Sequence, residues 1–265
     1  MPQKNLHVTL VQSDLRWENT PANLEMFTRK IDTVSKTDLI ILPEMFSTGF
    51  SMNTEKLAEE MSGPTVEWMR KTTAEKQCAL CGSLMIRERN EYFNRLVWMQ
   101  ADGAYRVYDK RHLFSLSNEP AIYTAGKKRL VVELAGWKIC PLICYDLRFP
   151  VWSRNIPSDS YDLLIYVANW PEKRNHAWKS LLIARAIENQ CYVAGVNRVG
   201  HDGNHIYHSG DSMMADAMGN TLYQLQHEED IFTIELNAAV LRDARESLPF
   251  LKDRDDFVLN EKEKN

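Results

Sequence analysis

The chain has 265 residues, of which 44% are hydrophobic and 26% charged, so it is long and apolar enough to bury a large core. This composition excludes disordered, collagen-like and low-complexity classes, and a formal net charge of −4 argues against nucleic acid as the main partner. Because no run approaches the roughly 18 consecutive apolar residues of a membrane-spanning helix, and the N-terminus does not fit a signal peptide, we expect a cytoplasmic protein that does not bind membranes.

The first part of the chain alternates predicted strands with predicted helices. Residues 38–43 form a continuous apolar run, as expected of a strand buried on both faces. Pro21 and Pro64 each stand where a proline favours the first turn of a helix. The expected elements, in chain order, are a strand at 6–11, a helix from 20 to about 36, a strand at 38–43, a helix from 63 to about 77 and a strand at 78–86.

Hairpins follow in the second part of the chain. Turn signals at 101–103, 135–136 and 219–220 each separate two runs of strand-forming residues. The expected elements are hairpins at 92–99 with 105–108, 130–134 with 137–144 and 212–217 with 221–236, strands at 161–168 and 191–199, and a helix at 176–190. This alternation predicts an α/β sandwich with a mixed sheet.

No repeat or flexible linker interrupts the pattern, so we expect one domain over residues 1–265. Its core spans about 6–236, and a charged C-terminal tail spans 237–265. The sequence leaves open whether this tail wraps the body, joins a partner subunit or stays solvated.

Five cysteines, an odd number, do not indicate a disulfide framework and favour a reduced setting. Cys78 and Cys81 have the CxxC spacing of redox pairs, but their run is strand-like, and residues three apart on a strand point to opposite faces. No second ligand pair completes a metal site. We interpret these two, together with Cys140 and Cys191 in apolar strands, as packing residues.

Cys144 differs, because an apolar strand ends there and a polar, aromatic segment begins. A nucleophile on a tight turn after a strand stands out from the sheet edge, where backbone N–H groups stabilise anions. A core cysteine at a strand end fits the local sequence equally well. Glu44 and Lys110 also follow strand ends, and such ends gather in one crevice of an α/β sheet. Together the three favour an acid–base–nucleophile set over separate surface charges and caps.

The motifs LPEMF, YDKRHLF and LICYDLRFP, which contain Glu44, Lys110 and Cys144 in this order, resemble those of the nitrilase superfamily of carbon–nitrogen hydrolases. The segments YVANWP, ARAIENQ and GDS are also similar, so the resemblance spans residues 6 to about 236. Within the superfamily, the chain looks most like the short amidases of the ω-amidase branch. The resemblance implies a four-layer αββα sandwich, no metal, no organic cofactor, and a homodimer for which 148–155 and 184–190 are candidate interface segments.

The resemblance also implies a role for each residue of the set. Cys144 is expected to attack an amide carbonyl and form a thioester, with Glu44 as the general base. Lys110 is expected to stabilise the oxyanion, together with the backbone N–H of Tyr145. Glu119, in a loop after the lysine, matches a second glutamate of the family.

The ω-amidase branch hydrolyses the terminal amide of small dicarboxylate monoamides, such as 2-oxoglutaramate and 2-oxosuccinamate, and releases ammonia. The carboxylate of such a substrate requires a cation, and we predict that Arg174 or Lys173 supplies it. Arg148 is expected to be structural, pairing within the turn that carries Cys144. Phe46 and Trp170 are predicted to line the substrate pocket, although a core position fits each of them as well.

Two alternatives remain at this point. The same site fits another carbon–nitrogen hydrolase reaction, namely the hydrolysis of a nitrile or of an N-carbamoyl group. A catalytically silent, ligand-binding member of the fold is the other alternative, although such a protein has no need to keep Glu44, Lys110 and Cys144 together.

Overall fold

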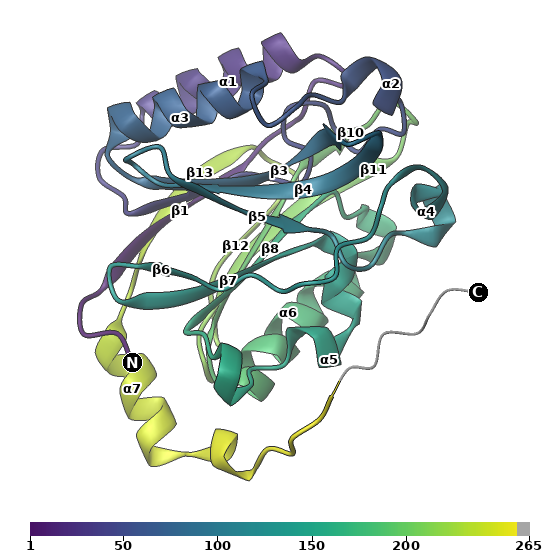
Figure 1. The fold of residues 1–265 in the computed structure, drawn as a ribbon. Helices are drawn as coiled ribbons and strands as arrows, with labels where there is room; N and C mark the ends of the chain where they lie inside the picture. Colours follow the sequence, from purple (N-terminus) through teal and green to yellow (C-terminus); the bar gives the residue numbers. More distant parts are fainter. Residues whose placement is uncertain (259–265) are drawn as a thin grey trace.

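Two β-sheets lie face to face in the middle of the molecule, and helices cover the outer face of each sheet (Figure 1). The structure is a computed structural model that describes residues 1–258. Its layers run helix, sheet, sheet, helix, which confirms the predicted αββα sandwich (Figure 1). The single mixed sheet expected from the strand pattern is therefore two sheets.

The first sheet has six strands in the order β13-β1-β2-β3-β4-β5, and α1 and α3 cover its outer face (Figure 1). Both helices begin at the predicted prolines, with Asn19 and Gly63 as their N-caps. The bounds are β1 (Leu6–Gln12), α1 (Thr20–Asp32), β2 (Leu39–Ile41), α2 (Thr54–Leu57), α3 (Pro64–Lys76), β3 (Ala79–Glu88), β4 (Glu91–Met99), β5 (Tyr105–Asp109) and β13 (Asp230–Leu236).

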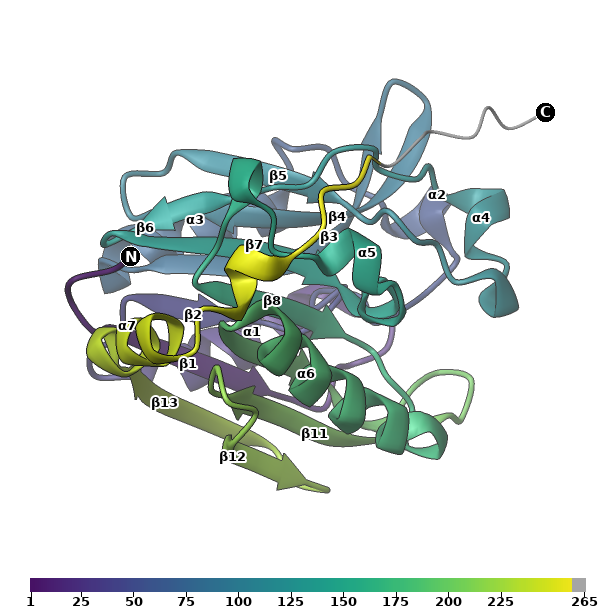
Figure 2. The ribbon, with the colours of Figure 1, turned by 90° about the horizontal axis from the view of Figure 1, so that it is seen from below.

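The second sheet has seven strands, in the order β10-β11-β9-β8-β7-β6, with β12 paired to β11. The long helix α6 packs on its outer face against β9 and β11 (Figure 2). The bounds are α4 (Glu119–Ile122), β6 (Val132–Leu134), β7 (Trp137–Ile143), α5 (Pro150–Ser153), β8 (Leu163–Ala168), α6 (Asn175–Asn189), β9 (Tyr192–Asn197), β10 (Val199–His201), β11 (Tyr207–Ala215), β12 (Thr221–Gln226) and α7 (Ala238–Ser247).

Strand alternation divides the side chains of the first sheet between two apolar cores. On β4, Leu96 and Trp98 face the core between the sheets, whereas Val97 and Met99 join the core beneath α1 and α3. The same alternation separates the CxxC pair, because Cys81 lies in the core between the sheets and Cys78 in the core beneath the helices. Both are free thiols, and burial raises the pKa of Cys78 to about 11, so the interpretation as packing residues is confirmed.

Parallel pairing sets the direction in which the central strands end. In the first sheet β1, β2 and β3 are parallel, and in the second sheet β7, β8 and β9 are parallel. The carboxyl ends of β2, β7 and β8 therefore deliver the residues that follow them to one edge of each sheet.

The prediction of one strand over residues 221–236 was wrong. The run splits into β12, which pairs with β11 of the second sheet, and β13, which pairs with β1 of the first sheet. Between them, His227 adopts a positive φ of 65°, which turns the chain from one sheet to the other. The two strands are each strand-like in sequence, so the pattern alone does not show the crossing.

The C-terminal tail packs on the body through α7. Ala238 and Leu241 of α7 are buried in the core, and Arg245 forms an ion pair of 2.6 Å with Asp162 and donates to the carbonyls of Gln190 and Tyr161. Of the predicted tail, residues 259–265 lie outside the described residues. Among residues 1–258, no helix is long and apolar enough to cross a membrane.

Candidate active site

Four strand ends converge on one point of the molecule. Glu44 follows β2 by three residues, Lys110 comes directly after β5, Cys144 directly after β7 and Asn169 directly after β8. The structure thus brings together Glu44, Lys110 and Cys144, as the sequence predicts, although they come from both sheets. Glu119, the first residue of α4, joins them.

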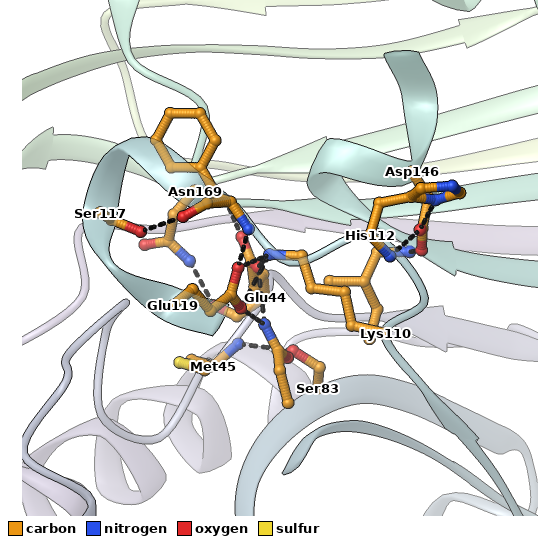
Figure 3. A network of polar contacts seen from close by, with 12 residues as sticks. Glu44, Met45, Ser83, Lys110, His112, Ser117, Glu119, Asp146 and Asn169 are labelled. Atoms are coloured by element: carbon orange, nitrogen blue, oxygen red, sulfur yellow. Dashed lines mark hydrogen bonds and ion pairs between the residues drawn. The ribbon is translucent and has the colours of Figure 1, made fainter. Parts of the chain in front are cut away.

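Lys110 lies between two carboxylates at the bottom of this site (Figure 3). Its Nζ is 2.9 Å from Oε1 of Glu44, and 3.1 and 3.0 Å from Oε1 and Oε2 of Glu119. All three side chains are at most 1% exposed. An ammonium so far from water needs opposite charge, and here it has two carboxylates as partners.

Both carboxylates also accept from donors other than Lys110. Asn94 donates from Nδ2 to Oε1 of Glu44 at 2.8 Å and, more weakly, to Oε1 of Glu119 at 3.3 Å. The backbone N–H of Asn169 donates to Oε2 of Glu44 at 2.8 Å, and the backbone N–H of Phe114 donates to Oε2 of Glu119 at 2.5 Å. Both acids are therefore fixed in orientation as well as position.

The electrostatics of the site follow from burial and these contacts. Burial alone would lower the pKa of Lys110, but the charges of Glu119 and Glu44 outweigh it and raise that pKa, so the side chain stays an ammonium. Burial raises the pKa of Glu119 against the opposing effect of Lys110. Burial and the nearby charge of Glu44 raise the pKa of the Cys144 thiol, which is therefore protonated at neutral pH and hydrogen-bonded to Glu44. Its proton is thus next to an acceptor.

The turn that carries Cys144 is tight. Cys144 has a φ of +42°, a conformation that a residue with a Cβ rarely adopts, and it opens a short 3-10 helix at Cys144–Arg148. The buried carboxylate of Asp146 holds this turn by accepting from the N–H of Ile143, the hydroxyl of Tyr108 and the N–H of His112. The N–H of Tyr145 lies in the first turn of the helix, where no intrahelical acceptor is available.

A cavity of about 680 Å³ opens above these residues. Glu44, Lys110 and Cys144 line it, as do Tyr145, Asn169 and Trp170. A larger depression, of about 1010 Å³, lies between α3 and the β3–β4 hairpin, but charged surface residues such as Glu60, Arg70 and Arg87 line it and no cysteine does. The smaller cavity is the one that combines enclosure with reactive groups.

Two guanidinium groups that face this cavity have no carboxylate partner within residues 1–258. Arg148 stacks over the ring of Trp170 at 4.9 Å, and Arg174 over the ring of Phe114 at 5.3 Å. Among residues 1–258, neither side chain forms an ion pair within 4.0 Å. Burial lowers the pKa of Arg174, an effect that the adjacent Arg148 adds to. The arrangement leaves two cations available to an anion.

Three expectations about binding residues are corrected by this geometry. Arg148 does not pair within the turn, because Asp146 is occupied by other donors and Arg148 points into the cavity instead. Lys173 is exposed outside the cavity. Phe46 is fully buried beneath α1 and α3, where it packs against Phe27, and does not line the cavity. Trp170 lines the cavity, as expected.

Comparisons with known proteins agree with this site. The sequence model of the carbon–nitrogen hydrolase family matches residues 7–246. The chain belongs to the carbon–nitrogen hydrolase family. The resemblance to the nitrilase superfamily is thereby confirmed.

Three individual proteins resemble the hydrolase over nearly their whole length. It is 43% identical to the ω-amidase YafV of Escherichia coli K12, over 96% of this chain and 98% of that protein. It is 34% identical to the 2-oxoglutaramate amidase of Bacillus subtilis 168, over 93% and 96% of the two chains. The crystal structure of XC1258 from Xanthomonas campestris, a CN-hydrolase superfamily protein with an arsenic adduct in its active site, matches with a TM-score of 0.95 and 44% identity, over 97% of this chain and all of the other.

Two asparagines of the site were not predicted from sequence as functional residues. Asn169 was noted only as part of the segment YVANWP, yet its N–H contacts Glu44 and faces Cys144. Asn94 was not considered. It occupies an inward-facing position of β4, in phase with Leu96 and Trp98, where a polar residue is unusual. That break in the alternation was the available signal.

We expect iodoacetamide to alkylate Cys144 alone in the folded hydrolase, because Cys144 is the one cysteine among residues 1–258 that lines the cavity. Because burial and the charge of Glu44 raise the pKa of the thiol, we expect the steep rise in alkylation rate above pH 9. In Glu44→Gln the charge is gone, so this rise moves to lower pH by about one to three units. Mass spectrometry of tryptic peptides over a pH series measures both effects.

Urea-unfolded protein serves as the control, in which all five cysteines react. Equal labelling of several cysteines in the folded state, or a pH dependence unchanged in Glu44→Gln, would contradict this description of the site.

Proposed function

We propose that the hydrolase cleaves the terminal amide of small dicarboxylate monoamides, such as 2-oxoglutaramate and 2-oxosuccinamate, and releases ammonia. The observation that carries this proposal is the cysteine Cys144 set beside Glu44 and the Lys110 ammonium, in a cavity that also presents two guanidinium groups without an ion pair among residues 1–258. The names of the relatives from E. coli and B. subtilis support the same class of substrate.

In the proposed first half of the reaction, Glu44 takes the proton of Cys144 as Sγ forms a bond to the amide carbon. The carbonyl oxygen becomes an oxyanion, which the Lys110 ammonium and the N–H of Tyr145 stabilise. Glu44 then returns the proton to the nitrogen, the C–N bond breaks, and ammonia leaves. The product is a thioester on Cys144.

In the second half, Glu44 takes a proton from water as the water oxygen attacks the thioester carbon. Lys110 and Tyr145 stabilise the second oxyanion in the same way. The S–C bond breaks, the proton returns to sulfur, and a free carboxylic acid leaves. Glu119 acts by holding the Lys110 ammonium, since it contacts Lys110 and does not line the cavity.

The guanidinium groups supply the substrate-binding part of the proposal. A monoamide of a dicarboxylic acid carries one carboxylate, and an Arg guanidinium donates to both oxygens of such a group. Arg174 remains our proposed carboxylate ligand, and the position of Arg148 in the cavity makes it a second donor rather than a structural residue.

We expect rapid ammonia release from 2-oxoglutaramate and slow release from glutamine and asparagine, measured with a coupled glutamate dehydrogenase assay. Cys144→Ala removes the nucleophile and lowers the rate by at least about four orders of magnitude without unfolding the protein. A simple nitrile and an N-carbamoyl amino acid are assayed in parallel.

Preferential turnover of the nitrile or the N-carbamoyl compound would replace the proposed substrate class with another reaction of the family. The absence of turnover on all of them would favour a silent, ligand-binding protein, and a wild-type rate in Cys144→Ala would refute the thioester mechanism.

The carboxylate ligand is tested by steady-state kinetics of Arg174→Ala on 2-oxoglutaramate. Loss of a charged, two-point contact raises KM about 10- to 100-fold, because such hydrogen bonds contribute roughly 1.5–3 kcal/mol. Lys173→Ala, which removes a neighbouring cation outside the cavity, is the matched control and leaves KM unchanged. A KM in Arg174→Ala equal to that of the control would remove Arg174 from the binding site.

We also propose that the hydrolase is a homodimer. Val151 in the segment 148–155 and Ile187 in the segment 184–190 are 48% and 51% exposed, large apolar side chains that association would cover. Light scattering after size exclusion is expected to give twice 30.7 kDa for the wild type and a monomer for Val151→Glu/Ile187→Glu. Val240→Glu, at an equally exposed position on α7, is the control. A wild-type monomer would contradict the proposal.

A further inference from the structure

One side chain contacts both acids of the site without reaching the cavity. Asn94 donates from Nδ2 to Oε1 of Glu44 at 2.8 Å and to Oε1 of Glu119 at 3.3 Å. It is fully buried and does not line the cavity, so a substrate in the cavity does not touch it. Whatever Asn94 contributes to the reaction passes through the two carboxylates.

The orientation of the Asn94 amide leaves one of its buried atoms without a hydrogen bond among the described residues. Its Oδ1 is buried and has no hydrogen-bond partner among the described residues, whereas its NH₂ group has two carboxylate acceptors. An unpartnered buried acceptor destabilises a fold, so an asparagine kept only for packing would be better replaced by leucine. The reverse orientation would place Oδ1 against two carboxylates. The geometry therefore favours hydrogen bonds from the NH₂ group to the two carboxylates, although Oδ1 is left without a donor among the described residues.

The contact also determines which oxygen of Glu44 is available for chemistry. Asn94 and Lys110 both donate to Oε1, at 2.8 and 2.9 Å. Oε2 accepts from the N–H of Asn169 at 2.8 Å, the same N–H that faces the sulfur of Cys144. Two donors on Oε1 thus stop the carboxylate from rotating and keep Oε2 on the side of Asn169.

The backbone of Asn94 adds a second link, because its carbonyl accepts the N–H of Lys110 at 3.0 Å. One residue of β4 therefore fixes the base through its side chain and the start of the lysine segment through its main chain.

We propose that Asn94 is the positioning residue that orients Glu44 for proton transfer from Cys144, a proposal that rests on the function proposed above. A neutral donor fixes the carboxylate without adding charge. The titratable groups that face Glu44 are Lys110 after β5, Glu119 on α4, Cys144 after β7 and Tyr123 after α4. Of these, Lys110 alone brings a positive charge, and it is shared with Glu119.

The test is Asn94→Leu, which keeps the volume, suits the apolar positions of Leu96 and Trp98 on the same face, and removes the unpartnered Oδ1. Losing the donor is expected to lower kcat about 10- to 100-fold, because Glu44 is no longer held towards Cys144. KM is expected to stay within twofold, because Asn94 does not line the cavity. Asn94→Ala serves in the same way if the leucine variant does not fold.

Ser83→Ala is the matched control. Ser83 accepts the N–H of Met45, next to Glu44, but touches neither carboxylate (Figure 3). Ser83→Ala is therefore expected to keep kcat within twofold. If both variants lower kcat alike, Asn94 merely stiffens this part of the fold and the proposal is overturned. An unchanged kcat in Asn94→Leu, or a rise in KM alone, would overturn it as well.

Alkylation of Cys144 by iodoacetamide at pH 7 repeats the test without an amide substrate. At this pH, below the steep rise in rate, the thiol reacts with Glu44 as its base, so the rate is expected to fall about 10- to 100-fold in Asn94→Leu and to stay within twofold in Ser83→Ala. If the wild type fails to hydrolyse 2-oxoglutaramate while this loss is found, the proposed substrate is wrong and the role of Asn94 stands. If the loss is absent, the role of Asn94 fails whatever the substrate.

Discussion

The structure depends on one buried interaction, the ammonium of Lys110 held between the carboxylates of Glu44 and Glu119. Removing three charges from water costs several kcal/mol for each ion before their attraction is counted. The fold offsets this cost with further donors, namely Asn94 and the backbone N–H groups of Asn169 and Phe114. Breaking any one of these contacts leaves part of a buried charge without a partner.

The two-sheet architecture brings the residues of this site together. Glu44 and Lys110 come from the first sheet, Cys144 and Asn169 from the second, so the site exists only where the edges of the two sheets meet. The turn at Cys144, with its φ of +42°, sets the thiol beside Glu44, and Asp146 anchors that turn to Tyr108 of β5 and to His112 in the loop after β5. Local backbone strain at the nucleophile is thus balanced by hydrogen bonds across the sheet interface.

The family resemblance predicts the four layers, whereas the strand pattern alone predicts a single mixed sheet. The central residues follow from the strand pattern, because Glu44, Lys110 and Cys144 each come after a strand and such strand ends converge. The strand pattern does not predict the direction of a side chain beyond the end of a strand. Phe46 stands two residues after Glu44, but Met45 has a φ of +43° and turns the chain, so Phe46 points into the helix-covered core. The crossing of β13 to β1 depends on long-range pairing, which no local pattern encodes.

The charges that line the cavity also orient the substrate in the proposed reaction. Glu44 lies at the floor of the cavity and shares the Lys110 ammonium with Glu119 behind it, while Arg148 and Arg174, which form no ion pair within residues 1–258, line its wall. In the proposed reaction a monoanionic amide binds with its carboxylate at the guanidinium groups and its neutral amide at the thiol, since the reverse orientation sets carboxylate against carboxylate. Hydrolysis turns the amide into a second carboxylate beside Glu44. The amide, which binds beside the thiol because it is neutral, becomes a negatively charged carboxylate. Repulsion between this carboxylate and Glu44 favours release of the product.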